Sequence, residues 1–202
     1  MDLPKNRQEY RNLDCSELDF TDRSLEQARF IRCRFKGASM QGIHTTHCFF
    51  EECDFTFARL NDSFHQSSAF LSCEFHGASL FAAGFEQCKC TGTTFAGADL
   101  TACTIKGGDY SFTILNDCDF HGWDLRGIKL EHAFLQNCNL KKADLREANL
   151  RHAVLTGAHL EQADLRGADI SGVDLQSIHF KNTRIDLPQA MLIAEAAGCI
   201  CR

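Results

Sequence analysis

The amino-acid sequence predicts an all-β solenoid, a chain wound into stacked coils, with a short helix at its C-terminal end. The first observation is a five-residue period: of the 34 positions divisible by five from Phe20 to Ile185, 31 are Phe, Leu, Ile, Met or Tyr. The second is a small residue two positions earlier, where 27 of 34 are Ala, Cys, Ser, Thr or Gly. Each unit therefore points one large and one small side chain inward.

A period of five fits neither an α-helix at 3.6 residues per turn nor a flat strand at 2. Each unit must extend briefly and then turn a corner, which closes the chain into a polygon. If one unit forms one side of a square, 20 residues complete a coil, and coils stack about 4.8 Å apart. The repeats then form roughly 8 coils.

The units also share a sequence signature. Ala98-Asp99-Leu100, Ala143-Asp144-Leu145 and Ala163-Asp164-Leu165 are typical of it. These runs resemble the A(D/N)LXX signature of the pentapeptide repeat family, and the repeats cover most of the chain. The resemblance implies that the solenoid is a right-handed quadrilateral β-helix.

A solenoid needs capped ends, because an open terminal coil offers unpaired strand edges to other chains. We expect residues 1–12 to form an N-terminal cap, residues 13–186 the β-helix, and residues 187–202 a C-terminal helix and dimerisation tail. Asp186 and Gln189 form a capping-box pattern and Gly198 suits a helix stop, so the sequence predicts a helix over 187–197.

That helix is apolar on nearly all sides, so it needs two partners. One face can cover the last coil, and the other predicts a twofold dimer joined at the C-termini. The alternative is a helix that lies flat on the coil end with a few exposed alanines. The residues expected in the dimer interface are Met191, Leu192, Ile193, Ala196 and Ile200.

The N-terminus has no apolar signal segment and no run of 18 apolar residues occurs, so we expect a cytoplasmic protein that does not associate with membranes. Eight of the twelve cysteines occupy the small inward position, which favours free, buried thiols over disulfides. The three at Cys33, Cys53 and Cys73 are 20 apart and should stack within disulfide reach of one another, with the reduced form favoured.

Nothing in the sequence indicates catalysis. No phosphate-binding loop, GxSxG or HExxH motif occurs, so we expect neither an enzyme nor a cofactor. His65 occupies an inward position, where a core histidine satisfied by hydrogen bonds is more plausible than a base. Cys88-Lys89-Cys90 and Cys199-Ile200-Cys201 lack neighbours for a four-ligand metal site, so no metal is expected.

The net charge of −6 is concentrated in the middle of the chain, since residues 41–125 carry 3 basic and 11 acidic side chains. Clustered Lys and Arg are absent there, which argues against direct nucleic-acid binding. The 20-residue spacing should stack Asp54 on Glu74 and Asp99 on Asp119. Asp124, Asp144 and Asp164 form another acidic column. Each is followed two positions later by an arginine, which predicts a charge-balanced wall. The candidate acidic contacts are Asp54, Glu74, Asp99, Asp109, Asp119, Asp124, Asp144 and Asp164.

A second outward column is apolar. Ile114, Phe134 and Val154 lie 20 apart at a phase that Asp, Asn or Ser usually hold here. A stacked apolar column marks a contact surface more often than scattered residues do; it either binds a partner or is tucked away by a local turn. Four bulky residues replace small ones and should widen or bend the coils: Trp123, Ile128, Val173 and Ile178.

The acidic outer side chains and the Asp-x-x-Gln-Ala motif of 186–190 resemble the topoisomerase-targeting branch of the family, which includes the Qnr-type, mycobacterial fluoroquinolone-resistance and albicidin-resistance proteins. This resemblance implies a dimeric DNA mimic that binds DNA gyrase or another type II topoisomerase and protects it from poisons. The alternative is an interaction scaffold for another protein partner, which would use the apolar column.

Overall fold

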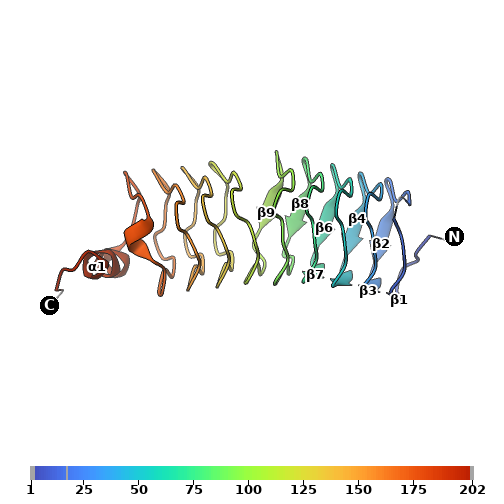
Figure 1. Ribbon diagram of the computed structural model, residues 1–202, viewed down its shortest axis with the longest axis horizontal. Helices are drawn as coiled ribbons and strands as arrows, with labels where there is room; N and C mark the ends of the chain where they lie inside the picture. The colour runs from blue at the N-terminus through green and yellow to red at the C-terminus, as the bar shows by residue number, and fades with distance from the viewer. Residues whose placement is uncertain (1–2, 17, 201–202) are drawn as a thin grey trace. The chain divides into compact units, whose positions relative to one another are not determined.

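The computed structural model describes residues 3–16 and 18–200 (Figure 1). The chain divides into two compact units, Met1–Asp109 and Tyr110–Arg202. Each unit is a parallel-strand β-solenoid, as the sequence predicts, and each is described in turn. The continuous β-helix over 13–186 and the cap over 1–12 remain proposals; the first strand of the first unit already lies at Glu9–Arg11.

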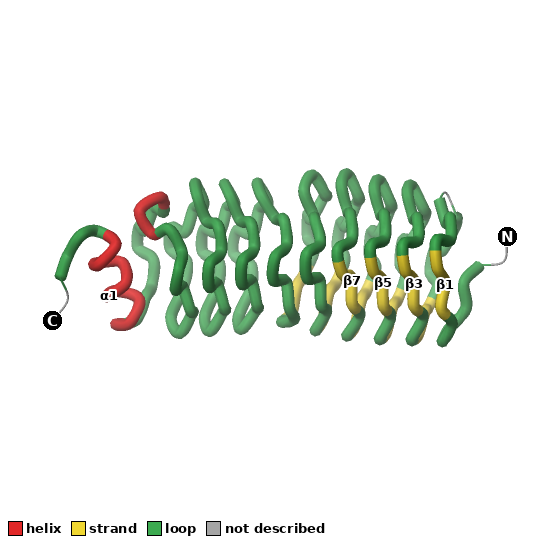
Figure 2. The backbone as a smooth tube through the Cα atoms, turned by 60° about the horizontal axis from the view of Figure 1, so that its bottom comes forward, coloured by secondary structure: helices red, strands yellow, loops and turns green. Residues whose placement is uncertain are grey.

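The first unit contains two parallel sheets of three-residue strands, one of which is visible as a row in Figure 2. The first sheet has the order β1 (Glu9–Arg11), β3 (Arg29–Ile31), β5 (Phe49–Glu51) and β7 (Ala69–Leu71). The second has the order β2 (Ser24–Glu26), β4 (His44–Thr46), β6 (Phe64–Gln66), β8 (Gly84–Glu86) and β9 (Thr104–Lys106).

Paired strands in both sheets are 20 residues apart, as in Tyr10↔Phe30. Isolated bridges with the same 20-residue offset form the two remaining sides, beginning at Asp14↔Arg34 and Asp19↔Ser39. The unit is therefore four-sided, which confirms the predicted coil length and cross-section.

Stacked phenylalanines fill the axis of the first unit. The Phe50 ring lies 5.0 Å from that of Phe30 and 4.8 Å from that of Phe70, nearly parallel to both. On the next side, Phe55 stacks at 4.8 Å on Phe35 and 4.7 Å on Phe75. These spacings match the distance between adjacent strands, so each ring extends the contact of the coil before it.

One place in this core is polar. Thr45 and His65 occupy inward positions normally held by large apolar residues, and both are buried. The two ring nitrogens of His65 are hydrogen-bonded, Nδ1 to the Thr45 hydroxyl at 2.8 Å and Nε2 to the Ser63 hydroxyl at 3.0 Å. His65 is thus the satisfied core histidine that the sequence predicts.

The corners of the coils require a left-handed backbone. A positive φ recurs at the second residue after each large inward residue, as at Asp22, Phe57 and Ala82 with φ near 55°. The corner N–H groups donate to the next coil, for example Asp22 N to the Gln41 carbonyl at 2.8 Å. This αL residue is what lets a five-residue unit turn.

Gly108 departs from that pattern, because it has φ +98° at the position of the small inward residue and follows Gly107 at φ +61°. A Cβ at Gly108 would lie 2.2 Å from the Cys88 carbonyl oxygen. Only glycine fits there.

The second unit uses isolated bridges on its sides, again offset by 20 residues, as in Asp124↔Asp144 and Lys129↔Asn149. Its axis is filled mainly by leucines, and a short 3₁₀ helix, η1 (Leu175–Ser177), follows the last regular coils. The described part of this unit contains no strand longer than a single bridge.

The C-terminal helix α1 (Leu187–Ala196) begins and ends nearly as predicted. The Asp186 carboxylate accepts from the Gln189 N–H, and the Gln189 side chain accepts from the Asp186 N–H, so the capping box is present. Gly198 follows the helix with φ +86°. Gln189 is buried and its amide donates to the carbonyls of Leu165 and Ala168, which ties one face of α1 to the coils, as predicted.

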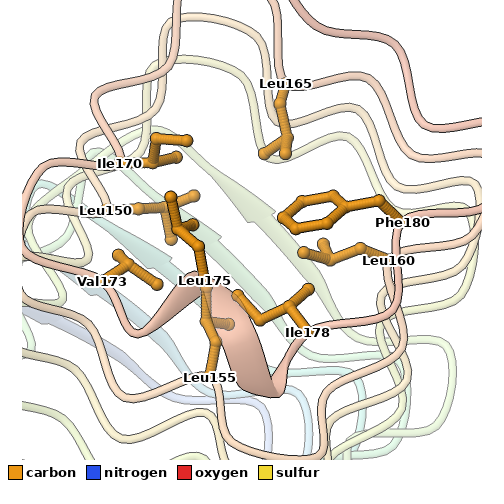
Figure 3. A pocket seen from close by; sticks show the side chains of 9 residues that line it. All are labelled: Leu150, Leu155, Leu160, Leu165, Ile170, Val173, Leu175, Ile178 and Phe180. Carbon is orange, nitrogen blue, oxygen red and sulfur yellow. The ribbon is translucent and has the colours of Figure 1, made fainter. Parts of the chain in front are cut away.

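The bulky residues of the second unit are accommodated differently. Ile128, Val173 and Ile178 are buried, whereas Trp123 is half-buried and its ring meets Phe120 edge-on at 4.9 Å. Figure 3 shows Val173 and Ile178 around a small apolar cavity at the end of the leucine core, next to η1. Three of the four bulky side chains are therefore packed inside the coils.

Candidate protein-binding surfaces

An acidic surface covers part of the first unit. Its centre is Asp54 and Glu74, which are bridge partners on one side, as predicted, with Glu51 and Glu52 at the preceding corner. The Asp54 carboxylate accepts only a local bond, from the Thr56 N–H at 2.9 Å. None of the ion pairs between described residues includes Asp54 or Glu74. We define the acidic surface by the seven carboxylates of residues 41–100, which lie on several sides of the coils: Glu51, Glu52, Asp54, Asp62, Glu74, Glu86 and Asp99.

Asp99 is ionised readily, because bonds from Thr101 lower the pKa of its carboxyl group. The Thr101 N–H donates to it at 3.0 Å. Asp109, the last residue of the first unit, is the bridge partner of Lys89. Asp119 belongs to the second unit, where its carboxylate accepts from the Asn139 amide at 2.9 Å, so the predicted stacking of Asp99 on Asp119 stays a prediction.

An Asp/Arg wall occupies one side of the second unit. Asp124, Asp144 and Asp164 are successive bridge partners, and each binds the arginine two residues on through two bonds. In the Asp144–Arg146 pair the two N–O distances are 2.9 and 2.6 Å. These bonds lower the pKa of the Asp144 carboxyl group. The wall is therefore charge-balanced, as the sequence predicts, and its carboxylates are already engaged.

An apolar face lies on another side of the second unit. Ile114, Phe134 and Val154 are successive bridge partners, as predicted, and Ile114 and Phe134 are 37% and 41% exposed. The side chains are therefore not tucked away. A second column lies two residues earlier in each coil and consists of Phe112, His132 and His152. The rings stack at 4.8 and 4.9 Å, and the sequence did not predict this column. The 20-residue spacing at the corner phase was the signal that could have revealed it.

The outer side of α1 is also apolar. Leu187 is 74% exposed and Met191 46%, while Leu192, Ile193 and Ala196 are half-buried and Ile200 lies exposed beyond the helix. Of the residues expected in a dimer interface, all are thus at least partly accessible. Cys201 lies outside the described residues.

The cysteines lack the environment of reactive thiols. Those in the described coils are buried except Cys118, which is half-buried, and Cys199 beyond the helix is exposed. Burial raises the pKa of Cys103 to about 12, so it stays protonated and a poor nucleophile. The Cys53 and Cys73 thiols donate to the backbone carbonyls of Phe30 and Phe50 at 3.4 and 3.5 Å.

Two features are absent from residues 3–16 and 18–200. No group of three or more His, Cys, Asp or Glu side chains there is arranged to hold a metal ion. None of the helices in this part of the chain has the length and apolar character that crossing a membrane requires.

Comparison with known proteins agrees with the repeat pattern. A family model described as "Pentapeptide repeats" matches eight copies over residues 111–141 and 143–182. Pentapeptide repeat protein MfpA from Mycobacterium tuberculosis is 34% identical over 104 residues, which are 49% of this chain and 57% of MfpA. The match therefore spans little more than half the length of that relative.

Two solved structures share the fold. Full-length QnrB1, a plasmid-mediated fluoroquinolone resistance protein, has a TM-score of 0.64 at 20% identity, with 96% of this chain and 99% of QnrB1 covered. HetL, a pentapeptide repeat protein involved in heterocyst differentiation regulation from Nostoc sp. strain PCC 7120, has a TM-score of 0.63 at 19% identity, covering 91% and 90%. Residues 111–141 and 143–182 thus match the pentapeptide repeat model, and the chain shares the fold of QnrB1 and HetL.

Proposed function

We propose that the protein binds DNA gyrase or a related type II topoisomerase in the cytoplasm, presents carboxylates where the enzyme binds DNA, and protects it from poisons such as fluoroquinolones or albicidin-like antibiotics. Its role is binding rather than catalysis, and its partner is a protein rather than nucleic acid or a membrane. QnrB1, which has the same fold, is described as a fluoroquinolone resistance protein, and this supports the proposal.

The charge density of the acidic surface carries the proposal. Residues 41–100 form three coil lengths and hold seven acidic and two basic side chains. With coils about 4.8 Å apart, this gives one carboxylate per roughly 2 Å along the axis, or one net charge per roughly 3 Å. Double-stranded DNA carries one charge per about 1.7 Å. A basic DNA-binding groove would therefore meet a similar field.

The second unit contributes less to this mimicry. The carboxylates of Asp124, Asp144 and Asp164 are held by arginines, so a cationic partner would first have to displace those side chains. Exposed ion pairs of this kind are weak, but both charges remain at the surface and cancel at a distance. We therefore assign the main contact to Asp54, Glu74 and their acidic neighbours.

Purified gyrase tests the proposal in a DNA supercoiling assay with and without a fluoroquinolone. We expect the protein to inhibit supercoiling or to reduce drug-stabilised DNA cleavage at micromolar concentration. The variant Asp54→Asn/Glu74→Gln should require about tenfold more protein for the same effect, because it removes two carboxylates that form none of the ion pairs between described residues. Its effect should also depend less on salt.

The matched control is Asp124→Asn/Asp144→Asn, which changes the net charge by the same amount in the Asp/Arg wall. Its activity should fall less than threefold. Equal losses in both variants would reject the assignment to the acidic surface. If the unmodified protein neither inhibits supercoiling nor protects gyrase from the drug, topoisomerase binding is rejected altogether.

We further propose that the protein is a homodimer joined through the C-termini, with Met191, Leu192, Ile193, Ala196 and Ile200 in the interface. Exposed apolar side chains on α1 support this, since burial of such a surface stabilises association. In sedimentation velocity, Leu192→Asp/Ile193→Asp should sediment as a monomer. A dimeric sedimentation coefficient for that variant would refute the helix-mediated interface.

A further inference from the structure

The apolar face of the second unit has two adjacent columns of side chains. One contains Phe112, His132 and His152, stacked ring on ring, with Phe112 52% exposed. The other contains Ile114, Phe134 and Val154, held in register by the bridges between their backbones. Over three coils the two columns form a surface about two residues wide, or about 7 Å between columns. We call these six residues the apolar face.

Charge is nearly absent around these columns. The segments 112–117, 132–137 and 152–157 contain eighteen residues and a single charged one, Asp117, although 24% of the chain is charged. Beside the histidine column, Arg151 is paired with Glu131 at 3.8 Å and with Asp169 at 3.7 Å, which leaves one net negative charge there. A nucleic acid or a strongly charged protein surface would gain nothing here, whereas an apolar partner would.

The backbone around Phe134 and Val154 is already hydrogen-bonded. Phe134 N–H donates to the Thr113 carbonyl at 2.8 Å and Val154 N–H to the Ala133 carbonyl at 2.9 Å, while Leu135 N–H donates to the Val154 carbonyl at 2.8 Å. An extended peptide laid across Phe134 and Val154 would find few backbone partners and would leave most of its own N–H and C=O groups unsatisfied. An α-helix satisfies its own backbone, so it can bind to such a dry surface.

The spacing of the coils also suits a helix. Ring centres in the histidine column are 4.8 and 4.9 Å apart, and an α-helix rises 5.4 Å per turn. Across three coils the mismatch is about 1 Å, within the reach of side chains. A helix lying along the columns would therefore place residues i, i+4 and i+7 on successive coils.

The area of the face is small for an interface with a second copy of the chain. Two coil spacings by the width of two columns, with side-chain margins, give on the order of 200 Å². A stable interface between folded subunits buries about 800 Å² per partner. We propose that the apolar face is the docking site for an amphipathic α-helix of a partner protein. This inference does not depend on topoisomerase binding, because it uses none of the residues of the acidic surface.

The probe is a fluorescein-labelled, helix-stabilised 18-residue peptide with leucine at i, i+4, i+7 and i+11 and uncharged Gln, Ser or Ala elsewhere. Its comparator has the same composition with leucine at alternate positions. In fluorescence anisotropy we expect the helical peptide to bind at least tenfold more tightly than the comparator, with equal affinity in 50 and 500 mM NaCl. Phe134→Asp and the milder Phe112→Ser should each weaken binding at least fivefold.

Lys129→Asp is the matched control, because Lys129 is exposed at the same outward phase on another side of the coil. Its affinity for the helical peptide should be unchanged. Equal binding of the comparator, loss of binding in 500 mM NaCl, no binding at millimolar peptide, or equal weakening by Lys129→Asp would each overturn the proposal. Self-association that Phe134→Asp abolishes, without peptide binding, would assign the face to a second copy instead.

Discussion

His65 should make the first unit sensitive to mild acid. Its side chain is buried, and burial, followed by the charge of His44, lowers the pKa from 6.5 to about 3. Between these values the unfolded chain binds a proton that the folded chain does not, so stability falls as pH decreases below 6.5. At 1.36 kcal/mol per pKa unit, His65 should reduce the free energy of unfolding by about 2 kcal/mol between pH 7 and pH 5.

The matched variant is Ser63→Ala/His65→Phe. It removes the titrating ring and the hydroxyl that would lose its partner, while Thr45 keeps a bond to the Ser68 hydroxyl at 3.1 Å. Phenylalanine suits the position, because Phe85 lies one coil further on and other columns of this unit stack phenylalanines.

Urea denaturation followed by circular dichroism at pH 7 and pH 5 measures the effect. The unmodified protein should lose about 2 kcal/mol more than the variant over this interval, since titrations elsewhere cancel in the difference. Imidazole nitrogen chemical shifts should show His65 still neutral at pH 5. Equal losses in the two proteins, or a protonated ring at pH 5, would refute the reasoning.

Three further substitutions test the packing, each by urea denaturation or amide exchange. Phe50→Ala should destabilise the first unit by about 3–5 kcal/mol. Its control, Phe57→Ala, removes a ring that is 57% exposed and should cost less than about 1 kcal/mol. Equal costs would contradict the stacked core. Gly108→Ala should lower the free energy of unfolding by about 2–3 kcal/mol more than Gly122→Ala does, because only the first adds a Cβ against a carbonyl oxygen. Similar costs would show that the backbone relaxes freely. Gln189→Ala should cost about 2 kcal/mol and speed exchange of the α1 amides, and unchanged exchange would mean that its buried bonds do not anchor the helix.

The fold was predictable because a five-residue period leaves few alternatives. Large side chains at every fifth position must share one interior, and the stacked rings of Phe30, Phe50 and Phe70 show them doing so. The helix was predictable from local chemistry, since Asp186 and Gln189 form their capping bonds within one turn. The core role of His65 followed from its inward phase, although its two hydroxyl partners did not.

The candidate surfaces were predictable only in part. Phase and spacing placed Asp144 in a balanced wall and Phe134 in an apolar column, and both were confirmed. The stacked rings of Phe112 and His132 were missed, because corner residues follow no polarity pattern in this chain. The division after Asp109 was also not predicted, since the inward pattern continues across it.

The sequence alone determined the period, the coil length, the interior residues and the helix ends, because each depends on residues at fixed spacing within one coil or one turn. Only the tertiary structure decided which outward charges are free. The arginine two positions after Asp144 predicted a balanced pair, but only the structure shows that this pair is bidentate and that no ion pair among the described residues reaches Asp54. The difference lies in the geometry of the side chains, which periodicity cannot specify. It determines which carboxylates of this protein are available to bind a partner.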